Sequence, residues 1–168
     1  MHVLICGAGR VGQGIARRLA REKHEITIID ENADLVDQVS IDLDVRGIVG
    51  HAAHPDVLKR ARAADCEMII AVTHFDEINM VICQIAHTIF SVPFKIARVQ
   101  WASAIVSIAN AAFDTESGIG ETDKLLDMQT FMRSVSFYTP KESSDYDTFE
   151  TSGEVSKQLP KGVDLKQV

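Results

Sequence analysis

Three features are scarce or missing in this sequence. Of its 168 residues only three are cysteines, Cys6, Cys66 and Cys83, and their irregular spacing argues against a disulfide framework or a zinc site. No apolar run reaches the roughly 18 residues that a membrane span needs, and no basic region with an apolar signal core opens the chain. The net charge is −7, so positive charge is in deficit. We therefore expect a cytoplasmic protein without a nucleic-acid partner.

Short apolar runs alternate with amphipathic helical patterns along the first hundred residues. The predicted strands are 2–6, 25–30, 44–49, 67–72 and 94–99, and the predicted helices are 11–21, one from about Asn32, 55–63, and 77–90 with Asp76 as its cap. In the last helix the expected core-facing side chains are Val81, Ile82, Ile85, Ala86 and Ile89. This order predicts an α/β fold: a Rossmann-like parallel β-sheet with helices on both faces and right-handed crossovers.

A glycine-rich turn joins the first strand to the first helix. Residues Gly7, Ala8, Gly9, Arg10, Val11 and Gly12 form the pattern G-x-G-x-x-G in its expected context. Gly7 permits the tight turn, Gly9 lets the backbone approach a diphosphate, and Gly12 allows close packing of helix on sheet. The helix N-terminus offers unpaired N–H groups to an anion. We therefore expect a nucleotide phosphate site here; Arg10 could cover the ligand or serve only as a surface residue.

An acidic residue closes the second strand at the distance that this motif requires. Asp30 can accept hydrogen bonds from ribose hydroxyls, and both Asp30 and Glu31 would repel a 2′-phosphate. The pattern thus favours NAD(H) or an adenosine nucleotide over NADP.

The end of the third strand supplies small residues and two histidines. Gly50 and Ala52 would let an adenine lie close to the backbone, since ligands of open α/β sheets bind at strand carboxyl ends. His51 and His54 have the spacing H-x-x-H, but they lie on a loop without a nearby cysteine or carboxylate pair, so we expect no metal site.

Several longer stretches together resemble a known family. These are VLICGAGRVGQGIARRL, EITIIDEN, GHAAHPDVLKRA, ADCEMIIAVTHFDEINMVICQIA and KIARVQ, with an especially characteristic Thr73-x-x-Asp76-Glu77-x-Asn79-Met80. Over residues 1–100 the chain resembles the KTN or RCK N-terminal domain of potassium channels and transporters, and within it the regulatory subunits of Trk potassium uptake.

The resemblance implies a cytosolic, non-catalytic regulatory subunit. Such a subunit binds NAD(H), ATP or ADP and associates with a membrane potassium-translocating subunit, which would place it at the inner face of the cell membrane. By position, the implied cofactor-binding residues are Gly7, Ala8, Gly9, Arg10, Val11, Gly12, Asp30, Glu31, Gly50, His51, Ala52, Val72, Thr73, His74, Asp76, Asn79 and Arg98. Asp76, Glu77 and Asn79 could serve either the ligand rim or a dimer face.

Two alternatives stay open at this stage. Arg98 ends the fifth strand and could contact a phosphate or pair with Asp76 or Glu77. The glycine motif also suits the cofactor half of an NAD-dependent oxidoreductase, but such an enzyme needs a proton-transferring residue and a substrate domain. The residues after Gln100 are mostly polar and contain no histidine, which favours the sensor. Asp76 and Glu77, as adjacent helical residues, do not face each other and are poor candidates for acid–base catalysis.

The signal weakens after Gln100. We predict a nucleotide-binding domain over 1–113 and an atypical, partly disordered extension over 114–168. The segment 101–113 reads as an over-apolar helix, which predicts a homodimer or higher homo-oligomer. Phe131, Val135, Phe137 and Tyr138 could form a strand, although the family's usual sixth strand with its Ser-Pro-Glu-like ending, its long crossover helix and its C-terminal ligand domain have no recognisable counterpart.

Overall fold

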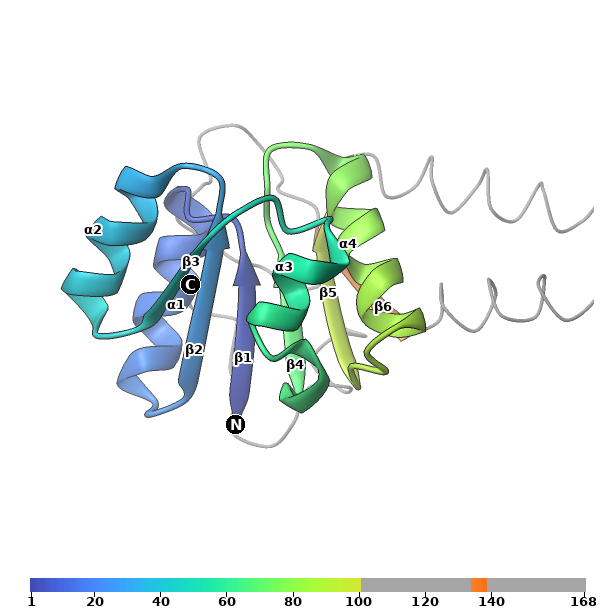
Figure 1. The fold of residues 1–168 in the computed structure, drawn as a ribbon, viewed down its shortest axis with the longest axis horizontal. Helices are drawn as coiled ribbons and strands as arrows, with labels where there is room; N and C mark the ends of the chain where they lie inside the picture. Colours follow the sequence, from blue (N-terminus) through green and yellow to red (C-terminus); the bar gives the residue numbers. More distant parts are fainter. Residues whose placement is uncertain (101–133, 139–168) are drawn as a thin grey trace, which may run out of the picture.

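Strand β1 (His2–Cys6) lies inside a parallel sheet whose strand order is β3-β2-β1-β4-β5-β6. The computed structural model describes residues 1–100 and 134–138 of the chain. The other strands are β2 (Glu25–Asp30), β3 (Arg46–Val49), β4 (Met68–Ala71), β5 (Phe94–Arg98) and β6 (Val135–Tyr138), and Figure 1 shows them side by side with helices before and behind. The chain runs outward from β1 to β3 and then returns to β4 on the other side of β1. This reversal is the position at which doubly wound sheets bind ligands.

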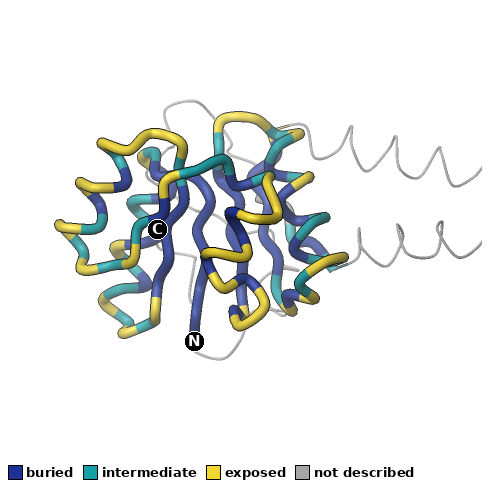
Figure 2. Tube along the Cα trace, in the orientation of Figure 1, coloured by how far each residue is buried: buried dark blue, intermediate teal, exposed yellow. Residues whose placement is uncertain are grey.

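The two faces of the sheet are covered by different helices. Alternate side chains of β1 explain this: Val3 and Ile5 pack with α1 (Arg10–Arg21) and α2 (Ala33–Leu43), while Leu4 and Cys6 pack with α3 (Pro55–Arg60) and α4 (Asp76–Thr88). A strand buried on both faces has no polar alternation, which is why β1 is a continuous apolar run. Figure 2 shows the strands buried and the outer surfaces of the helices exposed. The predicted fold class is confirmed.

Helix starts depend on capping, and the sequence identified one cap correctly. Asn32 precedes α2, and its side-chain oxygen accepts hydrogen bonds from the N–H groups of Asp34 and Leu35, at 3.0 and 3.3 Å. The predicted cap at Asp76 is wrong. Helix α4 begins at Asp76 itself, Phe75 is the N-cap residue, and no side chain caps this end.

The third helix is shorter than expected. It ends at Arg60 instead of Ala63, and a 3₁₀ turn, η1 (Ala63–Asp65), follows it. Arg62 lies between them with φ 60°, in the left-handed region, which ends the α-helix. The pattern of apolar residues around Arg62 does not predict a left-handed backbone conformation at this position.

Helix α4 and its C-cap residue, Ile89, expose two apolar side chains. Ile82 and Ala86 are buried in the core shared with β4 and β5, as expected, and Cys83 is buried with them. Val81 and Ile89 were expected to join them but are 45% and 56% exposed. Val81 and Ile89 therefore do not belong to the hydrophobic core of the described residues.

A sixth strand, β6, lies beside β5 at one edge of the sheet. β6 runs parallel to β5, with Lys95 opposite Val135 and Arg98 opposite Tyr138. The possible strand around Val135 is thus confirmed, and it supplies the sheet with a sixth strand although the family's usual Ser-Pro-Glu-like ending is not recognisable in the sequence. The segment 101–113, for which a helix was predicted, lies outside the described residues, and so does the predicted extension 114–168 apart from residues 134–138.

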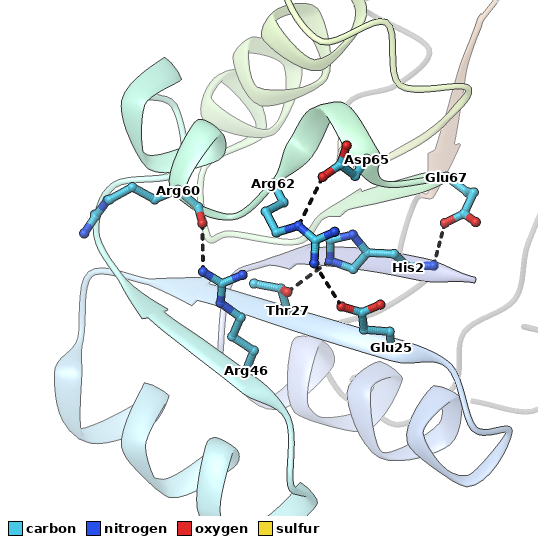
Figure 3. A network of polar contacts seen from close by, with 8 residues as sticks. All are labelled: His2, Glu25, Thr27, Arg46, Arg60, Arg62, Asp65 and Glu67. Atoms are coloured by element: carbon cyan, nitrogen blue, oxygen red, sulfur yellow. Dashed lines mark hydrogen bonds and ion pairs between the residues drawn. The ribbon is translucent and has the colours of Figure 1, made fainter.

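Polar contacts tie together the amino ends of the strands, on the edge of the sheet opposite the glycine-rich turn (Figure 3). The His2 ring contacts Thr27 Oγ1 at 3.1 Å, joining β1 to β2, and the His2 N–H donates to Glu67 ahead of β4. Arg62 contacts Glu25 at 3.6 Å and Asp65 at 3.1 Å. Neighbouring strands are thereby joined at this edge, while their carboxyl ends remain available for a site.

Candidate functional site

A cleft of about 620 Å³ opens at the carboxyl ends of the strands. Residues from every strand-end loop from β1 to β5 line it: Gly7, Gly9, Arg10, Val11, Ile29, Asp30, Glu31, Gly50, His51, Ala52, Val72, Thr73, His74, Phe75, Glu77, Ile78 and Arg98. A volume in this range suits a small molecule or cofactor. Most of the residues predicted from sequence are therefore brought together in one place.

The three glycines of the glycine-rich turn have different surroundings, and each lacks a side chain for a different reason. Gly7 has φ +116°, and a Cβ there would lie 2.8 Å from the Val72 carbonyl oxygen. A Cβ on Gly12 would collide with the carbonyl oxygen of Gly7. A Cβ on Gly9 would meet nothing within 4 Å. The fold therefore requires glycine at positions 7 and 12, while the absent side chain of Gly9 leaves open space in the cleft.

The N-terminus of α1 faces this open space. Gly9 is its N-cap residue and has no side chain to cap the helix, and no acidic residue lies in the first turn. The free N–H groups and the helix dipole make this end attractive to an anion. Arg10 lines the cleft beside it and adds positive charge. The turn is thus suited to a phosphate or diphosphate group.

Asp30 connects the end of β2 to the glycine-rich turn. Its Oδ2 accepts a hydrogen bond from the Ala8 N–H at 2.6 Å, and its Oδ1 accepts one from the Asn32 N–H at 2.9 Å. The carboxylate also lines the cleft, beside Glu31. It can accept hydrogen bonds from sugar hydroxyls, and the two neighbouring carboxylates disfavour an additional phosphate at that point.

The β3 end of the cleft is formed by Gly50, His51 and Ala52. His51 Nδ1 accepts a hydrogen bond from the Ala53 N–H at 3.2 Å, and its ring meets the His54 ring edge-to-face, with 5.0 Å between centroids. Within residues 1–100 and 134–138, no group of three or more metal-binding side chains is close enough to hold an ion. His51 forms part of the wall of the cleft, and His54 packs against its ring.

Arg98 lies at the far end of the cleft, where β5 ends. It is only 5% exposed, and its Nε atom is buried without a hydrogen-bond partner among the described residues. The alternative pairing is not formed: neither Asp76 nor Glu77 makes an ion pair with Arg98 in this part of the chain, and Asp76 instead accepts the Gln100 N–H at 2.7 Å. A buried unpaired guanidinium N–H costs free energy unless something else satisfies it.

Four residues predicted for the cofactor site do not line the cleft: Ala8, Gly12, Asp76 and Asn79. Ala8 and Gly12 belong to the turn and are buried beneath its surface. Asp76 and Asn79 lie on α4 and bond to the strand ends instead. Three others line the cleft that the sequence reasoning did not assign to it, namely Ile29, Phe75 and Ile78, and Glu77, offered for either the ligand rim or a dimer face, also lines it. Phe75 and Ile78 lie inside the characteristic Thr73–Met80 stretch, so position within that motif was the available signal.

All three cysteines are free and buried. Burial raises the pKa of the Cys66 and Cys83 thiols to about 12, and it raises the pKa of Cys6 well above its usual value. Thiols are nucleophilic as thiolates, so these protonated groups are unreactive at neutral pH. They contribute to the core beneath the cleft and supply no chemistry to it.

The sequence profile of the TrkA-N domain matches residues 3–115. The chain belongs to the TrkA-N domain family. Two curated relatives are both Trk system potassium uptake proteins TrkA: that of Azorhizobium caulinodans is 52% identical and that of Halomonas elongata 47% identical, each over 100 residues. The matched region is 60% of this chain and 22% of each relative, so this TrkA-N chain corresponds to about a fifth of their length.

Solved structures share the fold of this TrkA-N domain. The TrkA-N domain of the inner membrane protein ybaL from Escherichia coli superposes with a TM-score of 0.58 at 21% identity, covering 79% of this chain and 94% of that one. The GsuK channel bound to NAD gives 0.55 at 22% identity, covering 64% and 20%. The Shewanella denitrificans Kef CTD in its AMP-bound form gives 0.54 at 20% identity, covering 80% and 91%.

No helix within the described parts of this TrkA-N chain has both the length and the hydropathy that crossing a bilayer demands.

Proposed function

We propose that this TrkA-N domain binds an adenine nucleotide, NAD(H) or else ATP or ADP, in the cleft at the strand carboxyl ends. The observation that carries the proposal is the open space at Gly9. The fold does not need a glycine there, yet the missing side chain clears the N-terminus of α1 for an anion. Asp30, at the end of the neighbouring strand, then lies where the sugar of such a ligand is held.

The ligand class follows from the charges around the cleft. Asp30 and Glu31 suit free ribose hydroxyls and oppose a 2′-phosphate, so NADPH should bind worse than NADH. Arg98 is buried, and its Nε has no partner in the part of the chain that the structure describes, so it suits a second polar or anionic part of the ligand. Two structural neighbours are described as bound to NAD and to AMP, which supports the same ligand class for this fold.

We further propose that the domain is a regulatory sensor of a potassium uptake system. Support comes from relatives described as Trk system potassium uptake proteins TrkA. In this proposal the chain is not an enzyme; ligand binding shifts the balance between two arrangements of the assembly, and a membrane potassium-translocating subunit responds. The chain would then lie in the cytoplasm at the inner face of the membrane, held there by its partner.

Regulation of this kind requires an assembly, and we propose a homodimer or higher homo-oligomer. Val81 and Ile89 on the outer surface of α4 are exposed apolar side chains on a long helix next to the cleft. The over-apolar segment 101–113 follows β5 in the sequence. These exposed apolar residues can be buried against the same surface of a second copy, because an interface with two-fold symmetry uses the same residues on both subunits.

Calorimetric titration of the 168-residue chain tests the ligand proposal. NADH, NAD, ATP, ADP and NADPH are titrated separately, and we expect NADPH to bind more weakly than NADH. A chain that is folded by circular dichroism but binds none of the five ligands contradicts the proposal. Oxidation of bound NADH in the presence of small carbonyl compounds would instead favour an oxidoreductase.

A further inference from the structure

The first turns of α4 are bonded to the ends of two neighbouring strands. Asn79 is fully buried, and its Oδ1 accepts hydrogen bonds from the Thr73 N–H at 2.8 Å and the Thr73 hydroxyl at 2.7 Å. Its Nδ2 donates to the Thr73 carbonyl at 3.2 Å and to the Arg98 carbonyl at 2.8 Å. Both acceptor sites and both donors of the amide are therefore used.

A second side chain strengthens the same connection. Asp76, one turn earlier on α4, accepts the N–H of Gln100 just beyond the end of β5. Helix α4 is thus bonded to the loop after β4 and, at two points, to the end of β5. A buried, fully satisfied polar network of this kind holds one arrangement and resists small displacements.

Asn79 does not line the cleft, but both residues it holds do. Thr73 lies at the end of β4, and Arg98 extends its buried side chain toward the far end of the cleft. The carbonyl of Arg98 accepts a hydrogen bond from the amide of Asn79, while its Nε has no partner within residues 1–100 and 134–138. The hydrogen bonds of Asn79 thus connect it to a ligand in the cleft through Thr73 and Arg98.

We propose that Asn79 is a positioning residue that couples the Arg98 end of the cleft to helix α4. A ligand that engages Arg98 then stabilises the present position of α4, and by reciprocity a partner that holds α4 changes the affinity for that ligand. The proposal rests on the proposed function, namely that the cleft binds an adenine nucleotide.

AMP and NADH should occupy different lengths of the cleft. Comparing their affinities therefore distinguishes a positioning role of Asn79 from a general effect on stability. AMP can be held by Asp30 and the glycine-rich turn and leaves the Arg98 end empty, whereas a dinucleotide extends across the sheet reversal. We therefore expect Asn79→Ala to weaken NADH about tenfold by calorimetry, because Arg98 is no longer held. The affinity for AMP should change by less than about twofold.

Ile82→Val is the matched control. Ile82 is fully buried on the same helix, and no hydrogen bond joins it to either strand end. The shorter side chain should lower the melting temperature through lost packing, with both ligand affinities unchanged. If Ile82→Val reproduces the selective loss of NADH, the effect belongs to helix stability and the proposal is overturned.

A double-mutant cycle with Arg98→Ala examines the route of the coupling. In the Arg98→Ala background, adding Asn79→Ala should change NADH affinity by less than about twofold, because the group that Asn79 positions is gone. If the two substitutions instead lower NADH affinity independently, so that their fold-losses multiply, then Asn79 does not act through Arg98 and the proposal is overturned. Amide hydrogen exchange adds a second readout: NADH should protect residues 76–82 more than AMP does in the wild-type chain, and this difference should vanish in Asn79→Ala.

Asn79→Asp serves if the alanine variant does not fold. It keeps an acceptor for Thr73 but lacks the N–H that donates to the Arg98 carbonyl, so it should show the same selective loss of NADH. Equal losses for AMP and NADH, no loss for either, or unfolding of both variants would each overturn the positioning role. A wild-type chain that is folded but binds neither nucleotide would instead contradict the proposed function itself.

Discussion

The carboxylate of Asp30 accepts a hydrogen bond from the main-chain N–H of Ala8, with 2.6 Å between the heavy atoms. This contact joins the acidic end of β2 to the turn after β1, so the residue expected to bind a ribose also holds the phosphate turn. The same carboxylate accepts the Asn32 N–H ahead of α2. Asp30 therefore contributes to the geometry of the cleft in addition to its proposed role in binding the ligand.

Substitution of Asp30 by alanine should weaken both NADH and ATP by about 1–3 kcal/mol, because charge-assisted hydrogen bonds to the ribose are lost and Ala8 loses its acceptor. Calorimetry measures the effect. Asp37→Ala, an exposed acid on α2, is the control for net charge and should leave both affinities unchanged. Unaltered binding of both nucleotides to Asp30→Ala would remove Asp30 from the site.

The glycine-rich turn offers a pair of substitutions with opposite consequences. Gly9→Val should fold, because its Cβ enters open space at φ −69°, but it should abolish nucleotide binding by filling the position of the phosphates. Gly12→Ala should lower the free energy of unfolding, because its Cβ would collide with the Gly7 carbonyl oxygen. Thermal denaturation with and without NADH separates the two. A Gly9→Val chain that is folded and binds normally would contradict the phosphate assignment.

Alkaline pH should destabilise the domain through its buried thiols. Cys66 and Cys83 have folded-state pKa values of about 12 against an ordinary value of 9.0, so the unfolded chain loses these protons first. Their contribution to stability is complete below pH 9 and is lost as pH rises toward 12. Urea denaturation at a series of pH values should show a smaller alkaline loss in Cys83→Ala than in the wild-type chain.

The pKa of Lys95 is shifted in the opposite direction to those of the cysteines, so its effect on stability is tested with a separate variant. Burial lowers the pKa of its ammonium group, whose Nζ donates to the Val92 and Pro93 carbonyls at 2.7 and 3.2 Å. The unfolded chain therefore takes up this proton first as pH falls, and the contribution of Lys95 to stability declines toward neutral pH. Lys95→Met should remove the pH dependence of stability that Lys95 contributes. If both Lys95→Met and Cys83→Ala keep the alkaline stability profile of the wild-type chain, the burial of these two side chains is contradicted.

Assembly can be tested on the outer surface of α4. We expect at least a dimer by light scattering coupled to size exclusion at micromolar concentration. Introducing Val81→Glu together with Ile89→Glu should produce a monomer with little change in the fold, because both side chains are exposed in the single chain. Ile41→Glu, on an 81% exposed residue of α2, is the control. A wild-type mass of one chain, with and without nucleotide, would defeat the proposed dimer.

Much of this architecture could be read from the sequence because buried parallel strands are short continuous apolar runs. The strand Glu25–Asp30 was predicted with its observed bounds, and Asn32 was identified as a cap from its residue type. The glycine-rich turn was recognisable because steric demands at Gly7 and Gly12 and the open space at Gly9 leave three glycines at fixed spacing. Residue types and their spacing record all of these features, so sequence alone can reveal them.

The parts that were missed depend on contacts between distant residues. Asp76 has the residue type of a cap but bonds to Gln100, and Asn79 was assigned to the ligand rim but holds Thr73 and Arg98. Val81 and Ile89 fit a helical apolar pattern, and the pattern cannot say which of its members the sheet covers. The left-handed backbone of Arg62 leaves no compositional trace at all.

The burial of every cysteine makes this chain convenient to label. Since all three native thiols are sequestered, a maleimide dye should leave the folded wild-type protein largely unmodified. Phe75 lines the cleft and is 61% exposed, so Phe75→Cys would supply one accessible attachment point at its rim. A fluorophore attached there would turn the domain into an optical reporter of its own ligand, without any prior removal of native cysteines.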